Sequence, residues 1–141
     1  MAQIMQILGG GSLLHRVSRS MTTKLDRRFA TFGLTTQQAA LLLIACGGVA
    51  SPGQLAAAVG TDTAGMTKLL DRLQDKGLLR RRPNPADRRS VLVEPTERGQ
   101  ALVPDLTPVF GEVAGQAFDG FSGEDIADLT RLLRRMSQNL E

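Results

Sequence analysis

The fold of this chain is decided by the stretch LAAAVGTDTAGMTK, residues 55–68, which has the pattern of two short helices joined by a sharp turn. Ala56 is small enough for the second helix to cross the first, and Gly60 can adopt the positive φ that the turn requires. Met66 falls where an apolar residue must fill the joint. Because a plain helical hairpin uses the same residue types, this stretch alone leaves a hairpin and a helix-turn-helix open.

Positive charge is concentrated directly after this stretch. Residues 68–89 contain eight Lys or Arg and three acids, a net charge of +5, whereas the whole chain of 141 residues carries +3. Residues 90–141 contain four Arg and nine acids, a net charge of −5. A solvated face usually mixes its signs, and such local basicity is typical of a surface that faces phosphates. The charge distribution therefore favours DNA binding.

A β-hairpin is predicted after Gly77, where the helical period ends. The segments 78–82 and 90–93 are short enough for strands, and the polar, proline-containing connection 83–89 predicts an extended tip. An exposed loop of this kind is common in proteins of many functions. Arginines beside an acid at the tip, in Asp87-Arg88-Arg89, favour a wing that probes the DNA minor groove.

Capping residues predict where the helices begin. Thr35 and Ser51 each have Gln three residues on, Thr61 or Asp62 is expected to cap the second helix of the turn motif, and Thr96 and Ser122 precede the last two helices. Three glycines at 9–11 oppose an extension of the first helix by about 1 kcal/mol each relative to alanine, so we expect residues before 13 to kink, fray or order only against a partner. The predicted helices cover about 13–29, 36–45, 52–59, 62–76, 97–121 and 123–140, with Pro104 and Pro108 bending the fifth.

These elements predict a mainly α fold with a small β-hairpin, a winged helix-turn-helix in one continuous domain. Residues 34–95 would bind DNA, between an N-terminal helical region, 1–33, and C-terminal helices, 96–141. The first and last helices are amphipathic but have no evident partner in so small a domain. We therefore expect them to form the interface of a homodimer.

Five motifs occur in order along the chain: GLTTQQ at 33–38, LA at 55–56, LQDKGLLRR at 73–81, DRR at 87–89 and TERG at 96–99. Their succession resembles the MarR family of bacterial transcriptional regulators over nearly the whole length. The resemblance implies a homodimeric repressor, less often an activator, on a pseudo-palindromic operator, with recognition helices in major grooves and wings in minor grooves. It also implies a small aromatic, often phenolic, anionic effector that binds between the dimerisation helices and the DNA-binding part and releases DNA.

The resemblance also assigns DNA contacts by position. Lys68 is expected at a guanine edge or a phosphate, Asp87 is expected to hold the wing loop, and Arg89 is expected in the minor groove. Ala64 and Gly65 stand where relatives carry hydroxyl residues, which predicts weak base readout there, a closer approach of the backbone to DNA and more reliance on DNA shape. For Arg72 the alternative is a pair with Asp71, Asp75 or the wing. The expected DNA-binding residues are Ser51, Asp62, Thr63, Thr67, Lys68, Arg72, Arg81, Arg82, Asp87, Arg88 and Arg89.

An effector site would have to use residues other than Tyr and Trp, because the chain has neither. Its candidates are apolar groups for an aromatic ring and basic groups for an anion. For each of them, core packing or surface solvation is the simpler interpretation. The expected effector-binding residues are His15, Arg16, Arg19, Phe29 and Phe110.

Several other classes of protein are disfavoured. One His and one Cys cannot form a protein-only zinc site, and no base, phosphate loop or paired carboxylates accompany Cys46 or a serine. We therefore expect no enzyme, no metal and no cofactor. Cys46 lies on an apolar helix, where cysteine usually packs as a small hydrophobe. Two alternatives stay open, a thiol-based redox regulator acting through Cys46 and a winged-helix module for protein contacts.

The expected location is the cytoplasm, without a membrane partner. The hydrophobic stretches are too short and too interrupted for a membrane span. The N-terminus lacks the basic start and the cleavage site of a secretory signal. A single cysteine cannot form an internal disulfide, which suits a reducing compartment.

Overall fold

The computed structural model describes all 141 residues, Met1–Glu141. It contains six α-helices, a short 3₁₀ helix and one antiparallel sheet of two strands. The predicted fold class, a mainly helical winged helix-turn-helix with a β-hairpin, is confirmed. In chain order the elements are α1 (Ala2–Phe29), η1 (Ala30–Phe32), α2 (Thr36–Cys46), α3 (Pro52–Val59), α4 (Thr63–Asp75), β1 (Leu79–Asn84), β2 (Asp87–Pro95), α5 (Glu97–Ala117) and α6 (Gly123–Leu140).

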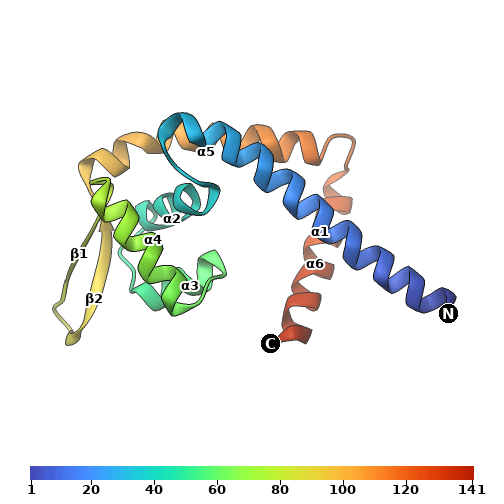
Figure 1. The fold of residues 1–141 in the computed structure, drawn as a ribbon, viewed down its shortest axis with the longest axis horizontal. Helices are drawn as coiled ribbons and strands as arrows, with labels where there is room; N and C mark the ends of the chain where they lie inside the picture. The colour runs from blue at the N-terminus through green and yellow to red at the C-terminus, as the bar shows by residue number, and fades with distance from the viewer.

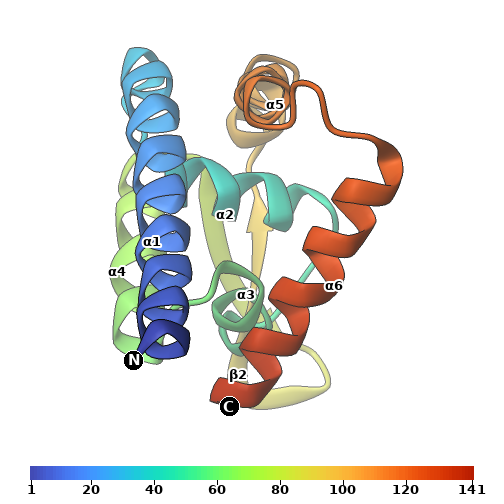
Figure 2. The ribbon, with the colours of Figure 1, turned by 90° about the vertical axis from the view of Figure 1, so that its right-hand side faces the viewer.

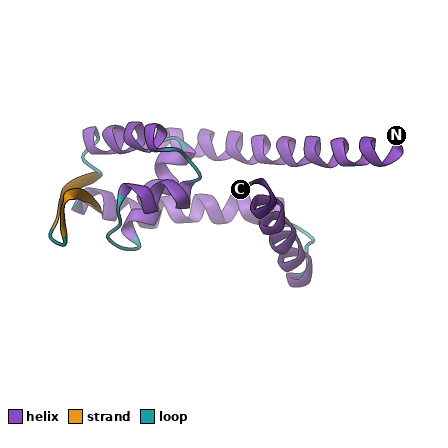
Figure 3. Cartoon of the chain, turned by 90° about the horizontal axis from the view of Figure 1, so that it is seen from below, coloured by secondary structure: helices purple, strands orange, loops and turns teal.

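The long helices α1 and α5 pack against each other along one side of the molecule, and α2, α3, α4 and the hairpin lie beneath one end of them (Figure 1). Seen from below, the hairpin and the N-terminus lie at opposite ends (Figure 3). The last helix, α6, turns away from α5 and stands apart from α1 (Figure 2), and none of the principal contacts between elements involves it. The chain thus has a compact end that carries the hairpin and an open end with two unpartnered helices.

One hydrophobic core of 18 buried residues fills the compact end. It joins the last turns of α1 to α2, α4, the hairpin and α5. α4 and the wing are therefore held on one common support. The side chains with no exposed surface are Phe29, Ala39, Leu41, Leu42, Leu73, Val93 and Leu106.

The helix-turn-helix joint has the predicted chemistry. Thr35 and Ser51 each form a complete capping box with the glutamine three residues on. Gly60 has φ 76°, in the left-handed region that favours glycine. Asp62, rather than Thr61, caps α4 by accepting the Gly65 N–H at 2.7 Å. Met66, only 1% exposed, fills the joint.

Two predicted boundaries are wrong. α1 begins at Ala2 and continues through Gly9–Gly11 without the expected kink, because a glycine weakens a helix but keeps its backbone donor. The strands extend to Asn84 and begin again at Asp87, so the wing ends in a tight turn at 85–86 and not in an extended tip over 83–89. The turn is tightened by side chains, since the Ala86 N–H donates to Asn84 Oδ1 and the Arg89 N–H donates to Asp87 Oδ1.

The fifth helix also differs from its predicted length. It ends at Ala117, before Phe121, and Gly120 takes φ 79° in the turn that follows. Pro104 and Pro108 both lie inside it. No single helix of the chain is both long and apolar enough to cross a membrane, and the one combination that meets the length and composition limits is the strongly bent pair of α1 with η1 and α2.

Candidate nucleic-acid interface

The outer face of α4 is available for contact with a partner because the opposite face is buried. Met66, Leu69, Leu70 and Leu73 face the core at helical spacing. The side chains between them are exposed, and neither Lys68 nor Arg72 has an acid within ion-pairing distance. The exposed residues on this face are Thr63, Ala64, Thr67, Lys68, Asp71 and Arg72.

The first turn of α4 is shaped by its own capping contacts. Asp62 uses a carboxylate oxygen as the cap, and the Thr67 hydroxyl donates to the Thr63 carbonyl at 3.0 Å. A Cβ on Gly65 would collide with the Thr61 hydroxyl. Glycine at 65 therefore makes room for a side chain of this same turn. Ser51 caps α3 in the same way, accepting the Gln54 N–H at 3.2 Å.

The tip of the wing is fixed by polar contacts that leave its arginines free. Besides its bond to the Arg89 N–H at 3.0 Å, Asp87 accepts the Ser90 hydroxyl at its carbonyl oxygen, at 3.2 Å. The Asn84 side-chain amide donates to the same hydroxyl oxygen at 3.0 Å. Arg88 and Arg89 are exposed, and neither forms an ion pair. The wing thus presents two exposed, unpaired cations on an ordered turn.

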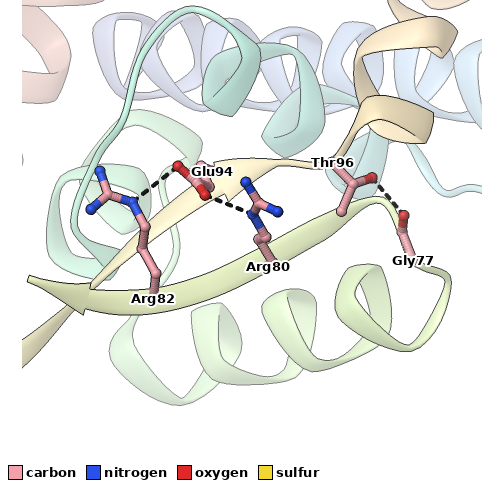
Figure 4. A network of polar contacts seen from close by, with 5 residues as sticks. All are labelled: Gly77, Arg80, Arg82, Glu94 and Thr96. Atoms are coloured by element: carbon pink, nitrogen blue, oxygen red, sulfur yellow. Dashed lines mark hydrogen bonds and ion pairs between the residues drawn. The ribbon is translucent and has the colours of Figure 1, made fainter.

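The arginines of β1 are in a different situation, because each is held by acids of this chain. Arg81 donates to Asp71 and to Gln74 of α4, both at 2.7 Å, which ties the wing to α4. Arg80 and Arg82 both donate to Glu94 of β2, at 2.6 and 3.0 Å (Figure 4). The hydrogen bond from Arg80 is the main reason that the pKa of Glu94 lies below its ordinary value.

Sequence reasoning missed these acidic partners. Arg81 and Arg82 were expected as DNA contacts, with no role for Asp71 or Glu94 in holding them. The sequence did contain a signal for the shared partner of Arg80 and Arg82. Side chains alternate between the two faces of a strand, so these two arginines, two residues apart, lie on the same face. Identifying Glu94 as their partner required the register of the hairpin, which places Arg80 opposite Glu94.

The N-terminus of α5 is locked onto the turn between α4 and β1. The Thr96 hydroxyl donates to the Gly77 carbonyl at 2.6 Å (Figure 4), and the Thr96 N–H donates to the Leu78 carbonyl at 3.0 Å. Gly99 lies so close that a Cβ there would collide with the Leu78 carbonyl oxygen. This joint fixes the long helix α5 relative to both parts of the candidate interface.

The five candidate effector residues are not brought together. A hollow of about 340 Å³ lies between α1 and α5, and Arg16 lines it beside Lys24 and apolar groups. Arg16 and Arg19 both line an adjoining polar hollow, and His15 lines neither. Phe29 has no exposed surface and packs on Phe110, with ring centroids 4.8 Å apart. Phe29 thus belongs to the core and Phe110 packs against it, which is the simpler of the two interpretations.

Metal and thiol chemistry receive no support from the site. No group of three His, Cys, Asp or Glu residues in the chain could hold a metal ion. Cys46 is half-buried, and this burial raises the pKa of its thiol. A raised pKa disfavours the thiolate on which redox sensing depends.

Comparisons with known proteins agree with this geometry. The family model described as MarR family matches residues 35–91. The chain is 29% identical over 133 residues to the multiple antibiotic resistance protein MarR of Escherichia coli (strain K12), covering 93% of this chain and 92% of the relative.

Solved structures give the same result over most of the chain. A mutant of E. coli MarR complexed with operator DNA has a TM-score of 0.82 at 28% identity, covering 93% of this chain and 95% of that one. CouR from Rhodococcus jostii, bound to p-coumaroyl-CoA, has a TM-score of 0.82 at 26% identity, covering 89% and 90%. The transcriptional regulator SlyA, at 20% identity and a TM-score of 0.84 over 92% of each chain, shares the fold.

Proposed function

Because the chain belongs to the MarR family of DNA-binding transcriptional regulators, we propose that it is a homodimeric, effector-responsive repressor of a pseudo-palindromic operator. Its role is regulatory and not enzymatic. We expect it to act in the bacterial cytoplasm, where chromosomal operators lie.

The proposal rests on a set of unpaired cations on one surface, which is formed by the outer face of α4 and the wing and is called the reading surface below. Lys68 and Arg72 project from the outer face of α4, and Arg88 and Arg89 from the wing tip, all without acid partners. A side-chain cation with no protein partner is available to a phosphate or a base edge. We infer that Thr63, Thr67 and Lys68 enter the major groove and that Arg89 enters the flanking minor groove. A related protein has been solved with operator DNA, which supports the same use here.

The proposed homodimer rests on apolar surface that this chain leaves uncovered. On α6, Ile126, Leu132, Leu133 and Met136 are 37–47% exposed on one helix face. The first half of α1 exposes Ile4, Ile7, Leu8 and Leu13 by 58–68%. Apolar patches of this extent mark interaction sites, so residues 1–33 and 96–141 would dimerise while 34–95 bind DNA. Two-fold symmetry then predicts half-sites about one helical turn apart, roughly 10 base pairs.

The proposed effector is a small aromatic anion. CouR is a relative with bound p-coumaroyl-CoA, an aromatic thioester with anionic phosphates. The hollow between α1 and α5 combines Arg16 and Lys24 with the apolar side chains of Leu13, Val17 and Val113. That combination suits an aromatic ring carrying a negative charge. An effector there would act on DNA through α5 and its joint with the wing.

The proposal is tested by fluorescence anisotropy with the DNA upstream of the gene and with a scrambled duplex, each at two salt concentrations. We expect tight binding to the upstream DNA, weaker binding to the scrambled duplex and a steep loss of affinity with salt. Lys68→Ala should cost about 1–3 kcal/mol on the upstream DNA if Lys68 contacts a base edge. An equal loss on both duplexes would assign Lys68 to a phosphate instead. Salt-insensitive or absent binding to both would overturn the proposal in favour of a protein-interaction module.

A further inference from the structure

Glu94 stands between two arginines on one face of the wing. In the hairpin register Arg80 lies directly opposite Glu94, and Arg82 lies one diagonal step nearer the tip. Arg80 Nε donates to Oε1 at 2.6 Å and Arg82 Nε donates to Oε2 at 3.0 Å, so each carboxylate oxygen serves one arginine. Directly opposite and diagonal positions are the two cross-strand distances over which long side chains interact.

The two bonds from Arg80 and Arg82 to the Glu94 carboxylate, here called the Glu94 clamp, leave the Nη atoms of each guanidinium free. Neither arginine uses its Nη atoms in a hydrogen bond or ion pair within the chain. In Figure 4 the Nη atoms of Arg82 lie on the side away from Glu94, toward the end of the hairpin that carries the tip. The Glu94 side chain is 18% exposed, against 38% for Arg82 and 64% for Arg80. The acid is therefore less exposed than either of the cations that it holds.

This arrangement lowers the entropy cost of a contact with DNA. A free arginine loses several rotamers when it binds, whereas one already fixed at Nε has lost them before binding. A guanidinium fixed at Nε still presents two Nη groups, which can bind a phosphate. Arg82 is the nearer of the two to the tip, where Arg88 and Arg89 are free.

We propose that Glu94 is a positioning residue, which holds Arg82 with its Nη edge toward a DNA phosphate beside the wing. The inference deepens the proposed function and rests on it. Arg80 completes the clamp by sharing the carboxylate, which keeps Glu94 beneath the two guanidinium groups.

A positioning role for Glu94 predicts the opposite effect on DNA binding from simple charge repulsion. If Glu94 were only an acid near DNA, Glu94→Gln would remove a repulsive charge and tighten binding. If Glu94 positions Arg82, the same change weakens binding, because Gln carries no charge and accepts only one of the two arginines well. Glu97→Gln is the matched control, since Glu97 is an exposed acid on the first turn of α5 with no ion pair.

Anisotropy titrations on the upstream duplex would compare wild type, Glu94→Gln, Arg82→Gln, the double variant, Arg82→Lys and Glu97→Gln. We expect Glu94→Gln and Arg82→Gln each to weaken binding by about threefold to tenfold and to reduce the salt slope. The double variant should be no weaker than Arg82→Gln alone, and Glu97→Gln should bind as well as wild type or better. Arg82→Lys keeps the charge but lacks the Nε–H anchor, so it should also weaken binding.

Tighter binding by Glu94→Gln would overturn the positioning role, as would a loss of equal size in the Arg82→Gln background. Circular dichroism would verify that each variant is folded, and if Glu94→Gln does not fold, Arg82→Lys decides, with wild-type affinity overturning the role. If the wild type itself shows no preference for the upstream duplex, the proposed function fails and the positioning role with it. A selective wild type with an unaffected Glu94→Gln overturns only the positioning role.

Discussion

At the scale of single residues, the basic side chains of the reading surface form two groups. Arg88 and Arg89 at the tip have no acid partner, whereas Arg81 and Arg82 on β1 are held by Asp71 and Glu94. The free group can reach into a groove at the cost of its rotamer freedom, and the held group is already oriented. Charge counting along the sequence located all four arginines but could not separate the two groups.

Arg89→Ala should weaken operator binding by about 1–3 kcal/mol without lowering the thermal stability of the protein. The physical reason is that Arg89 is exposed and its side chain contacts no acid, while only its backbone N–H holds the tip. Anisotropy and thermal unfolding would be measured together, with Arg135→Ala on α6 as the control arginine. Unchanged affinity of Arg89→Ala would remove the wing tip from the mechanism.

At the scale of elements, the joint between α5 and the wing connects the two ends of the molecule. Thr96 bonds the turn that follows α4, and Gly99 packs on the Leu78 carbonyl. The capping residues that begin helices, among them Thr35, Ser51 and Thr96, were visible in the sequence because a cap is a local interaction.

Contacts between residues far apart in the sequence, such as the cross-strand pair in the wing, could not be predicted in the same way. The predicted second strand ended at Val93, so Glu94 lay outside it and no cross-strand pair with Arg80 could be inferred. The actual register depends on the tight turn made by Asn84 and Asp87 through side-chain bonds to the backbone. The close approach of Gly99 likewise joins α5 to a distant turn, which local pattern does not reveal.

Gly99→Ala should destabilise the protein by about 1–3 kcal/mol, because the new methyl group meets a backbone carbonyl that cannot rotate away. Urea unfolding would measure the change. Gly111→Ala is the matched control in the same helix, since a Cβ at Gly111 meets nothing within 4 Å. That variant should be neutral or more stable by up to about 1 kcal/mol, from helix propensity alone. Equal stability of the two variants would show that the joint is not tight.

The Glu94 clamp should also make stability depend on pH. Arg80 and Arg82 lower the pKa of Glu94 in the folded protein. The stabilisation of the folded state by these ion pairs is therefore fully present at pH values above the pKa of Glu94 in the unfolded chain, about 4.3. This stabilisation is lost as the pH falls through the lower pKa that Glu94 has in the folded protein, where the carboxylate takes up a proton. Melting temperatures of wild type should therefore fall more steeply than those of Glu94→Gln as the pH is lowered from 5 to about 3. Parallel curves would contradict the ion pairs.

At the scale of the whole molecule, α6 and the first half of α1 have no covering partner in one chain. The amphipathic patterns of residues 13–29 and of α6 were readable from the sequence. The continuity of α1 through Gly9–Gly11 was not, because propensity alone argued against it. Both helices extend from the end of the molecule that lies away from the wing (Figure 3).

Leu133→Glu should convert the proposed dimer into a monomer, because a charge would replace an apolar side chain at the proposed interface. Light scattering during size-exclusion chromatography would measure the mass, and Gln138→Glu on the same helix is the control. The variant should also lose operator affinity, since a monomer contacts one half-site only. A dimer of unchanged mass and stability would move the interface away from α6.

In the proposed function, two copies of α4 and two wings bind one operator together. Hydroxyl-radical footprinting of the wild type on its upstream DNA tests this most directly. We expect two-fold symmetric protection, with the two copies of α4 about 10 base pairs apart and the wings over flanking minor grooves. Protection of a single asymmetric half-site, or none at concentrations that saturate binding, would contradict it.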